Sequence, residues 1–200
     1  IDQTVKDPAD LKFKLGIAPL GSIPDLGKED IIDSLDDKKS VAWEAYLSIR
    51  TSLAFLTDHG VPRSFLLTST RPNEGKSTSA LALAAVLAST KKRILLIDGD
   101  MRNPSLHQML NGKNTNGLSN YLAGEDNLDK LIYRDSQYGF DAMTAGPIPP
   151  NAAELLSSTR MRELVAKLSE TYDTVIIDAP PVLGLADIPL LADSVEGVIY

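Results

Sequence analysis

The sequence predicts an α/β fold in which helices cover both faces of a mostly parallel central sheet. Short, unbroken apolar runs are the first observation, and we expect them to be strands: residues 65–69, 93–98 and 175–178. Helical patterns separate these runs, at residues 76–89, 117–124 and 151–172. Strands that are apolar throughout are buried on both faces, and strands that alternate with helices form parallel sheets.

Size and composition indicate one main domain and exclude several kinds of site. The chain has 200 residues, 43% of them hydrophobic, which is enough for one well-buried domain with an appendage. Its net charge of −7 argues against sequence-independent binding of nucleic acid or anionic lipid. The absence of cysteine excludes disulfides, thiolate metal sites and cysteine nucleophiles. The longest apolar run, residues 80–88, is far shorter than the roughly 20 residues that cross a bilayer.

We expect an appendage at residues 1–40 and a domain at residues 41–200. Within the appendage, residues 15–24 contain two prolines, which forbid a continuous helix and favour an extended segment. Residues 25–39 are rich in Asp and Lys and have little to bury. That composition indicates a solvated linker.

The domain should begin with an amphipathic helix at residues 41–59, because apolar side chains recur there at mainly helical spacing. Gly60 and Pro62 provide its stop signal. The last segment, residues 197–200, has the pattern of a strand that has only begun. We therefore expect the domain to continue beyond Tyr200.

The segment TSTRPNEGKST, residues 68–78, follows a predicted strand and precedes an Ala-rich predicted helix, which is the context of a phosphate-binding loop. Backbone N–H groups of such a turn bind phosphates without any overall positive charge. We expect ATP and Mg²⁺ as ligands, with Lys76 at the β and γ phosphates, Ser77 at the metal and Thr78 at the α phosphate. The predicted nucleotide contacts are Thr70, Arg71, Pro72, Asn73, Glu74, Gly75, Lys76, Ser77 and Thr78.

Two positions depart from the usual loop pattern, since Thr70 stands where Gly or Ala is common and Asn73 where Gly is common. The alternative interpretation is an ordinary strand-to-helix turn with an exposed lysine. The coincidence of a strand, Gly-Lys-Ser-Thr and a helix instead favours a P-loop NTPase fold of the deviant Walker A, partition-ATPase-like class.

Two carboxylates, Asp98 and Asp100, end the next predicted strand in the segment IDGDMR, residues 97–102. Alternation along an extended chain should point both side chains the same way, at the carboxyl edge of the sheet where ligands bind. Carboxylates there can hold hydrated Mg²⁺ or accept a proton. An Asp-x-Asp after a strand is more often a helix cap or a solvated loop. The neighbouring phosphate loop favours the functional interpretation.

A third apolar strand ends at Asp178, in the segment TVIIDAPP, residues 174–181. A carboxylate at such a strand end is the usual partner of a phosphate loop, where it holds magnesium through water. Pro180 and Pro181 stiffen the exit of the strand. The metal ligands predicted from the three motifs are Ser77, Asp98, Asp100 and Asp178.

The two histidines show no pattern of metal or triad chemistry. His59 lies at a predicted helix end and His107 in a predicted loop. We assign both to structural roles.

In order and spacing, the three motifs resemble those of the bacterial tyrosine kinases that act with polysaccharide copolymerases. The resemblance rests on the phosphate loop, on ILLIDGDMRNPSLH at residues 94–107 and on VIIDAPP at residues 175–181. The stretches GLSNYLAG, residues 117–124, and AGPIPPNAAELL, residues 145–156, agree as well. Generic P-loop proteins do not share them, and the resemblance extends over nearly the whole chain.

This resemblance implies a kinase of exopolysaccharide synthesis and export that transfers the γ-phosphoryl group of ATP to tyrosines, chiefly in the tail of a neighbouring copy. Asp98 is then the candidate acceptor of the tyrosine proton, although it can also bind the metal. Arg102 would steady the acidic cluster or the transferred phosphate. The implied catalytic residues are Lys76, Asp98, Asp100, Arg102 and Asp178.

Residues 15–24 resemble the segment that follows a transmembrane helix in this family. The resemblance implies a membrane-spanning region upstream in the same polypeptide and a place at the cytoplasmic face of the bacterial inner membrane. The segment EAYLSIR, residues 44–50, resembles the family's oligomerisation motif Glu-x-x-Arg-x-x-Arg, with Leu47 in place of the middle arginine. It implies a homo-oligomer, and no nucleic-acid partner is expected.

Two other functions remain open at the level of sequence. One is a partition-type switch ATPase that phosphorylates no protein, and the pattern Asp98-x-Asp100-x-Arg102 argues against it. The other is a non-catalytic module in which ATP binding sets the assembly state of a polysaccharide copolymerase.

Overall fold

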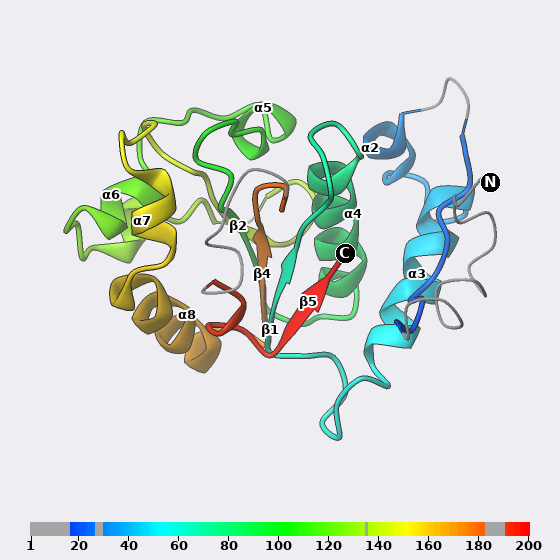
Figure 1. Ribbon diagram of the computed structural model, residues 1–200. Helices are drawn as coiled ribbons and strands as arrows, with labels where there is room; N and C mark the ends of the chain where they lie inside the picture. The colour runs from blue at the N-terminus through cyan, green and yellow to red at the C-terminus, as the bar shows by residue number, and fades with distance from the viewer. Residues whose placement is uncertain (1–16, 27–29, 135, 183–190) are drawn as a thin grey trace, which may run out of the picture. The chain divides into compact units, whose positions relative to one another are not determined.

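The computed structural model describes residues 17–26, 30–134, 136–182 and 191–200 (Figure 1). The chain divides into two compact units, residues 1–61 and residues 62–200.

The first unit contains helices α2 (Ile31–Ser34) and α3 (Val41–Leu53). Each begins at a side-chain cap, since the Asp30 carboxylate accepts from the Ile32 N–H and the Ser40 hydroxyl accepts from the Trp43 N–H. The Ser40 hydroxyl also donates to the Ser34 carbonyl over 2.8 Å, which ties the two helices together.

The predicted solvated linker at residues 25–39 contains the short helix α2, which was not predicted and has no buried residue. The expected end of the next helix was wrong. Helix α3 ends at Leu53 instead of residue 59, because the Thr57 hydroxyl donates to the Gly60 carbonyl and closes a separate turn. The expected extended segment begins at residues outside the described part of the chain, and residues 17–24 form neither helix nor strand.

The second unit is built on a sheet of five strands in the order β3-β2-β4-β1-β5. Every neighbouring pair is parallel. The strands are β1 (Ser64–Leu67), β2 (Ile94–Asp98), β3 (Asp141–Met143), β4 (Thr174–Asp178) and β5 (Gly197–Ile199). Four of them were predicted, whereas β3 is only three residues long and begins with an aspartate, so it gives no apolar run.

Helices cover both faces of this sheet, as the sequence predicts. Figure 1 shows α4 (Lys76–Ala88) on one side, and α6 (Leu118–Leu122), α7 (Ala152–Leu156) and α8 (Thr159–Thr171) on the other. Alternate strand residues, such as Leu95 and Ile97 of β2, pack with α6 and α8 in one buried apolar cluster. Among the described helices, none is long and apolar enough to cross a membrane.

The predicted helix at residues 151–172 is in fact two helices, because two serines interrupt it. Ser157 turns its hydroxyl back to the Ala153 carbonyl, and the Ser158 hydroxyl accepts from the Met161 N–H to start α8. The short helices α5 (Leu106–Met109) and η1 (Leu128–Lys130) were not predicted.

Candidate active site

The three sequence motifs meet at the carboxyl edge of the sheet because strand β4 lies between β1 and β2. In this register Asp178 pairs with Leu67 on one side and with Asp98 on the other. The phosphate loop follows β1, so it begins beside both aspartates. This edge is where open α/β sheets bind their ligands.

The phosphate loop has left-handed backbone at two positions, with φ of 64° at Asn73 and 80° at Gly75. Asparagine tolerates this conformation better than most residues, so the missing glycine at position 73 is accommodated. The carboxylate of Glu74 accepts from the Arg71 N–H over 3.0 Å and fixes the turn. Helix α4 starts directly afterwards and turns its first N–H groups toward the loop.

Lys76, the first residue of α4, is 9% exposed. Its ammonium donates to a carboxylate oxygen of Asp178 and to the Ser77 hydroxyl, 3.2 Å away, and lies 4.0 Å from a carboxylate oxygen of Asp100. One cation thus balances two nearly buried carboxylates. An anionic ligand at the loop would compete with them for the same ammonium.

Asp98 is fully buried and held by three backbone N–H donors, those of Asp100 at 3.2 Å and of Ser105 and Leu106 at 3.0 Å. Burial, with the nearby charge of Asp178, raises the pKa of Asp98 from its ordinary 3.8 to about 7, although the amide donors act in the opposite direction. Burial also raises the pKa of Asp178, and the ammonium of Lys76 opposes that rise.

The raised pKa of Asp98 predicts a pH-dependent stability. Below about pH 4 the carboxyl is protonated in both the folded and the unfolded chain, so it does not lower the free energy of unfolding. Between about pH 4 and pH 7 this carboxyl ionises in the unfolded chain but not in the folded one, so the free energy of unfolding falls as the pH rises. Above about pH 7 the folded carboxyl ionises as well and the decrease stops. We expect the effect of Asp98→Asn on the free energy of unfolding, without nucleotide or magnesium, to be more favourable by about 2 to 4 kcal/mol at about pH 8 than at about pH 4.

Urea unfolding of the parent and of Asp98→Asn at the two pH values measures this difference. Asp36→Asn, at an exposed position, should change neither value. An equal effect at both pH values would contradict the burial of a carboxyl with raised pKa.

The chain turns directly after β2, so the expected extended alternation of Asp98 and Asp100 was wrong. The N–H of Met101 bonds to the Gly99 carbonyl, and the Gly99 N–H bonds to the Asp178 carbonyl over 2.9 Å. A side chain at Gly99 would lie 3.1 Å from that carbonyl oxygen, so the glycine permits the close passage of β2 against β4. As a result Asp100 lines the ligand pocket, whereas Asp98 is buried behind it.

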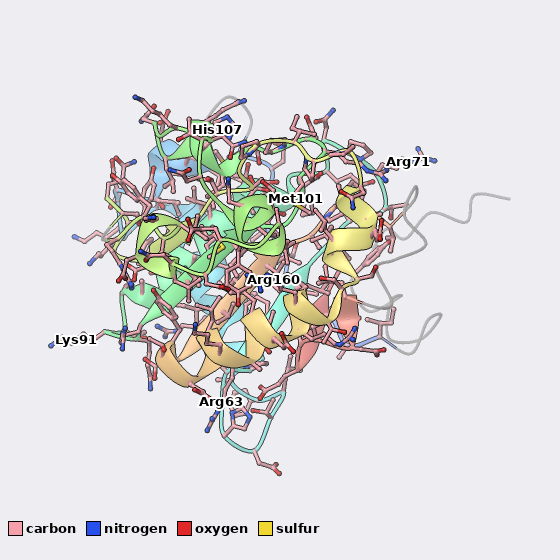
Figure 2. All side chains as sticks on the ribbon, turned by 90° about the vertical axis from the view of Figure 1, so that its left-hand side faces the viewer. Arg63, Arg71, Lys91, Met101, His107 and Arg160 are labelled. Atoms are coloured by element: carbon pink, nitrogen blue, oxygen red, sulfur yellow. The ribbon has the colours of Figure 1, made fainter. Side chains whose placement is uncertain are left out.

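The site is a pocket with a volume of about 370 Å³. Most of the predicted site residues line it: Pro72, Asn73, Gly75, Lys76, Ser77, Thr78, Asp100 and Arg102. Five do not: Thr70, Arg71, Glu74, Asp98 and Asp178. Of these, Thr70 bonds through its hydroxyl to the Tyr200 hydroxyl over 2.8 Å, and Figure 2 shows Arg71 at the periphery of the unit.

Other lining residues were not predicted as site residues: Ser69, Asn103, Ser105, Met109, Pro180 and Pro181. The two prolines follow Asp178 after a single residue, Ala179, so their position was a usable signal. The Thr68 hydroxyl donates to the Pro180 carbonyl over 2.8 Å and holds that exit loop against the end of β1. Ser105 is the N-cap residue of α5, and Met109 lies within this helix. No sequence pattern indicates that α5 lies beside the phosphate loop.

The residues of this pocket fit a magnesium ion that is bound together with a nucleotide. Hydroxyl and carboxylate oxygens, such as those of Ser77 and Asp100, are the ligands Mg²⁺ prefers. Within the described part of the chain, no three His, Cys, Asp or Glu side chains are grouped so as to hold a metal by themselves. Magnesium commonly takes only one or two carboxylates and completes its shell with water and phosphate oxygens.

Comparison with known proteins identifies the family. Residues 71–199 match the family described as AAA domain. Over 166 residues, which are 83% of this chain and 70% of the relative, the sequence is 39% identical to the tyrosine-protein kinase YwqD of Bacillus subtilis. The chain belongs to the bacterial tyrosine-protein kinases.

Two further similarities agree with this assignment. The tyrosine-protein kinase etk of Escherichia coli is 38% identical over 162 residues, which are 81% of this chain but 22% of that protein. The solved kinase domain of the Escherichia coli tyrosine kinase ETK superposes with a TM-score of 0.88 at 33% identity, covering 98% of this chain and 82% of that domain. The chain therefore spans most of one relative and a small part of the other.

Proposed function

We propose that this domain transfers the γ-phosphoryl group of ATP to tyrosine hydroxyls. The observation that carries the proposal is the position of Lys76 in the phosphate loop. Lys76 and Asp100 line one pocket, and the Lys76 ammonium also contacts the buried carboxylate of Asp178. Family membership supports the transfer to tyrosine. Direct transfer by positioning and charge stabilisation fits a phosphate loop beside carboxylates.

The loop residues would hold the nucleotide. The ammonium of Lys76 would leave its carboxylate partners for the β and γ phosphates, and the first N–H groups of α4 would bind the phosphate oxygens. The Ser77 hydroxyl, with Asp100 and Asp178, would hold Mg²⁺, which when bound neutralises phosphate charge. Thr78 would donate to the α phosphate. This arrangement fits ATP and magnesium as joint ligands.

Asp98 and Arg102 would serve the transfer itself. A carboxyl with pKa about 7 is half ionised at neutral pH, which suits a group that accepts a proton from the tyrosine. Arg102 lines the pocket and is exposed, so its guanidinium can reach a transferred phosphate.

We further propose that the whole protein regulates exopolysaccharide synthesis and export at the cytoplasmic face of the bacterial inner membrane. The likeness of residues 15–24 to the segment after a transmembrane helix supports a membrane-spanning copolymerase region upstream. The phosphate acceptor would be a tyrosine-rich tail of a neighbouring copy.

Detection of phosphotyrosine on a supplied tyrosine-rich tail peptide tests the kinase assignment. The parent should label the peptide in the presence of Mg-ATP, and Lys76→Met should not. Hydrolysis of ATP without any label would instead support the partition-type switch. Nucleotide binding with neither activity would support the non-catalytic assembly module.

Assembly is a separate prediction and rests on α3. Glu44 is exposed and lies on one helix face with the half-buried Leu47 and Arg50, at a spacing of three residues. If this face joins copies despite Leu47, Glu44→Ala with Arg50→Ala should convert the oligomer to a monomer in light scattering. The control, Lys39→Ala with Asp58→Ala, removes one charge of each sign at exposed positions and should leave the mass unchanged. An unchanged oligomer in the first variant would restrict this helix to a structural role.

A further inference from the structure

The second unit contains another cavity, with a volume of about 320 Å³, that shares none of its lining with the nucleotide pocket. It lies beside Thr144, which follows the carboxyl end of edge strand β3. Helix α5 and the loop after it form one wall, and η1 with the chain that follows forms the other. A carboxyl strand end is the expected place for a ligand in an open α/β sheet.

The chemistry of this cavity suits an anion with an apolar body. Leu110, Leu131 and Ile132 provide apolar wall, and Lys113 and Lys130 place two ammonium groups on exposed side chains at the lining. No carboxylate is among the lining residues, although the chain as a whole has a net charge of −7. Lys130 does approach a carboxylate outside the lining at 3.6 Å, but the pair is largely exposed and correspondingly weak.

His107 adds a polar ring to the lining of this cavity. Its Nδ1 atom is buried and has no hydrogen-bond partner, which is rare for a buried polar atom. Because Nδ1 makes no bond, a half-turn of the ring about χ2 would cost no hydrogen bond at that atom. The ring, which lines the cavity, could then present this nitrogen to an occupant.

Helix α5 joins this cavity to the active site. Ser105 and Met109 line the nucleotide pocket, whereas His107 and Leu110 line the second cavity. The N–H groups that start α5, those of Ser105 and Leu106, are two of the three that hold Asp98. A ligand that displaces α5 would therefore alter the hydrogen bonds of Asp98.

We propose that this cavity is a second ligand site, which takes a phosphate monoester with an apolar ring and acts on the active site through α5. A phosphate monoester carries about two negative charges at neutral pH and so matches two ammonium groups better than a carboxylate does. The same chemistry occurs in a phosphotyrosine side chain of a protein and in a free aryl phosphate. Binding at this site does not depend on the proposed kinase activity.

Phenyl phosphate is the probe, titrated into the full ¹⁵N-labelled chain and followed by amide chemical shifts. A ligand of this size should bind with Kd on the order of 1 mM. Shifts are expected at Lys113, Ile132 and Thr144, and also at Ser105 and Leu106 if α5 transmits binding. If no amide shifts at ten times that concentration, the site is overturned. If Lys113, Ile132 and Thr144 shift but Ser105 and Leu106 do not, the link through α5 is overturned.

The titration is repeated with Mg-ATP to separate the two pockets. The shifts at Lys113 should persist. If phenyl phosphate without nucleotide instead shifts Gly75 and Lys76 and leaves Lys113 unshifted, the probe occupies the phosphate loop, which overturns the proposal. If Mg-ATP alone causes no shift at Gly75 and Lys76, the proposed function fails while the second site stands.

Matched variants test the role of the two ammonium groups. Lys113→Gln with Lys130→Gln should weaken phenyl phosphate binding about tenfold. Lys91→Gln with Lys92→Gln removes the same charge, and Figure 2 places Lys91 far from His107, so this control should bind as the parent does. If both pairs of substitutions weaken phenyl phosphate binding equally, the effect is general electrostatics and the site is overturned. A dispersed amide spectrum confirms that each variant is folded.

Three further probes test the ligand class. Phenol and inorganic phosphate should each bind at least about tenfold more weakly than phenyl phosphate, and equal binding of either would overturn the class. A short phosphotyrosyl peptide is compared with its unphosphorylated form. Tighter binding than phenyl phosphate assigns the site to protein phosphotyrosine, and weaker binding assigns it to a free ester.

Discussion

Replacing Lys76 by methionine should weaken binding of ATP by a factor of about 10² to 10³, because the substitution removes a nearly buried positive charge that would contact the phosphates. The structure adds a second effect that the sequence does not suggest. Removal of the ammonium leaves Asp178 and Asp100 without their shared counter-charge. We expect the apo variant to lose about 3 to 5 kcal/mol of stability at about pH 8 and less as the pH falls, because the raised pKa of Asp178 lets its carboxyl take up a proton earlier than an ordinary aspartate.

A double variant separates the two effects. Lys76→Met with Asp178→Asn removes one charge of each sign, so stability should return to within about 1 kcal/mol of the parent while nucleotide binding stays lost. Calorimetric titration with Mg-ATP measures the affinity, and urea unfolding measures the stability. Parent affinity in the single variant would contradict the phosphate-loop assignment.

The phosphate loop and the main strands could be predicted because each has a local signal. An apolar run gives a buried strand wherever it lies in the sheet, and Gly-Lys-Ser-Thr between a strand and a helix gives the loop. The position of β4 between β1 and β2 follows from pairing along the whole chain, which no local pattern encodes. The convergence of Asp178 with Lys76 was therefore expected only through the usual partnership of these motifs.

The parts that were not predicted depend on single hydrogen bonds or on burial. Ser158 caps a new helix where apolar periodicity predicts one long helix. The turn at Gly99 separates Asp98 from Asp100, although alternation places them side by side. Helix α5 is only four residues long and carries no periodic signal, yet its first residue and its N-cap each donate an amide to Asp98. Short elements held by tertiary contacts are the least accessible to sequence patterns.

Replacing Asp98 by asparagine should lower the rate of tyrosine phosphorylation by about 10² to 10⁴ and leave binding of Mg-ATP nearly unchanged, because a proton acceptor contributes chiefly in the transition state. Rapid-quench measurement with a tyrosine-rich peptide gives the rate, and calorimetry gives the affinity. Asp178→Asn is the comparison, and it should weaken magnesium-dependent binding as well as the rate.

The pH profile distinguishes a base from a residue that only positions the chain. If Asp98 is the base, kcat/KM of the parent rises with pH up to about 7 and then levels, since only the ionised carboxylate accepts a proton and kcat/KM reports the free enzyme. Asp98→Asn should lose that limb. A low rate with the limb retained would mean that Asp98 holds α5 and the pocket in place through its three amide donors, and Asp100, which lines the pocket, would be the next candidate.

Two outcomes would contradict the assignment outright. A parent protein that hydrolyses ATP without labelling tyrosine would be a switch ATPase, for which Asp98 has no proton to accept. An Asp98→Asn variant that labels at full speed would show that the carboxylate is dispensable. In that case the burial of the Asp98 carboxylate would serve structure instead of chemistry, since both of its oxygens accept backbone N–H groups and asparagine could accept at only one of them.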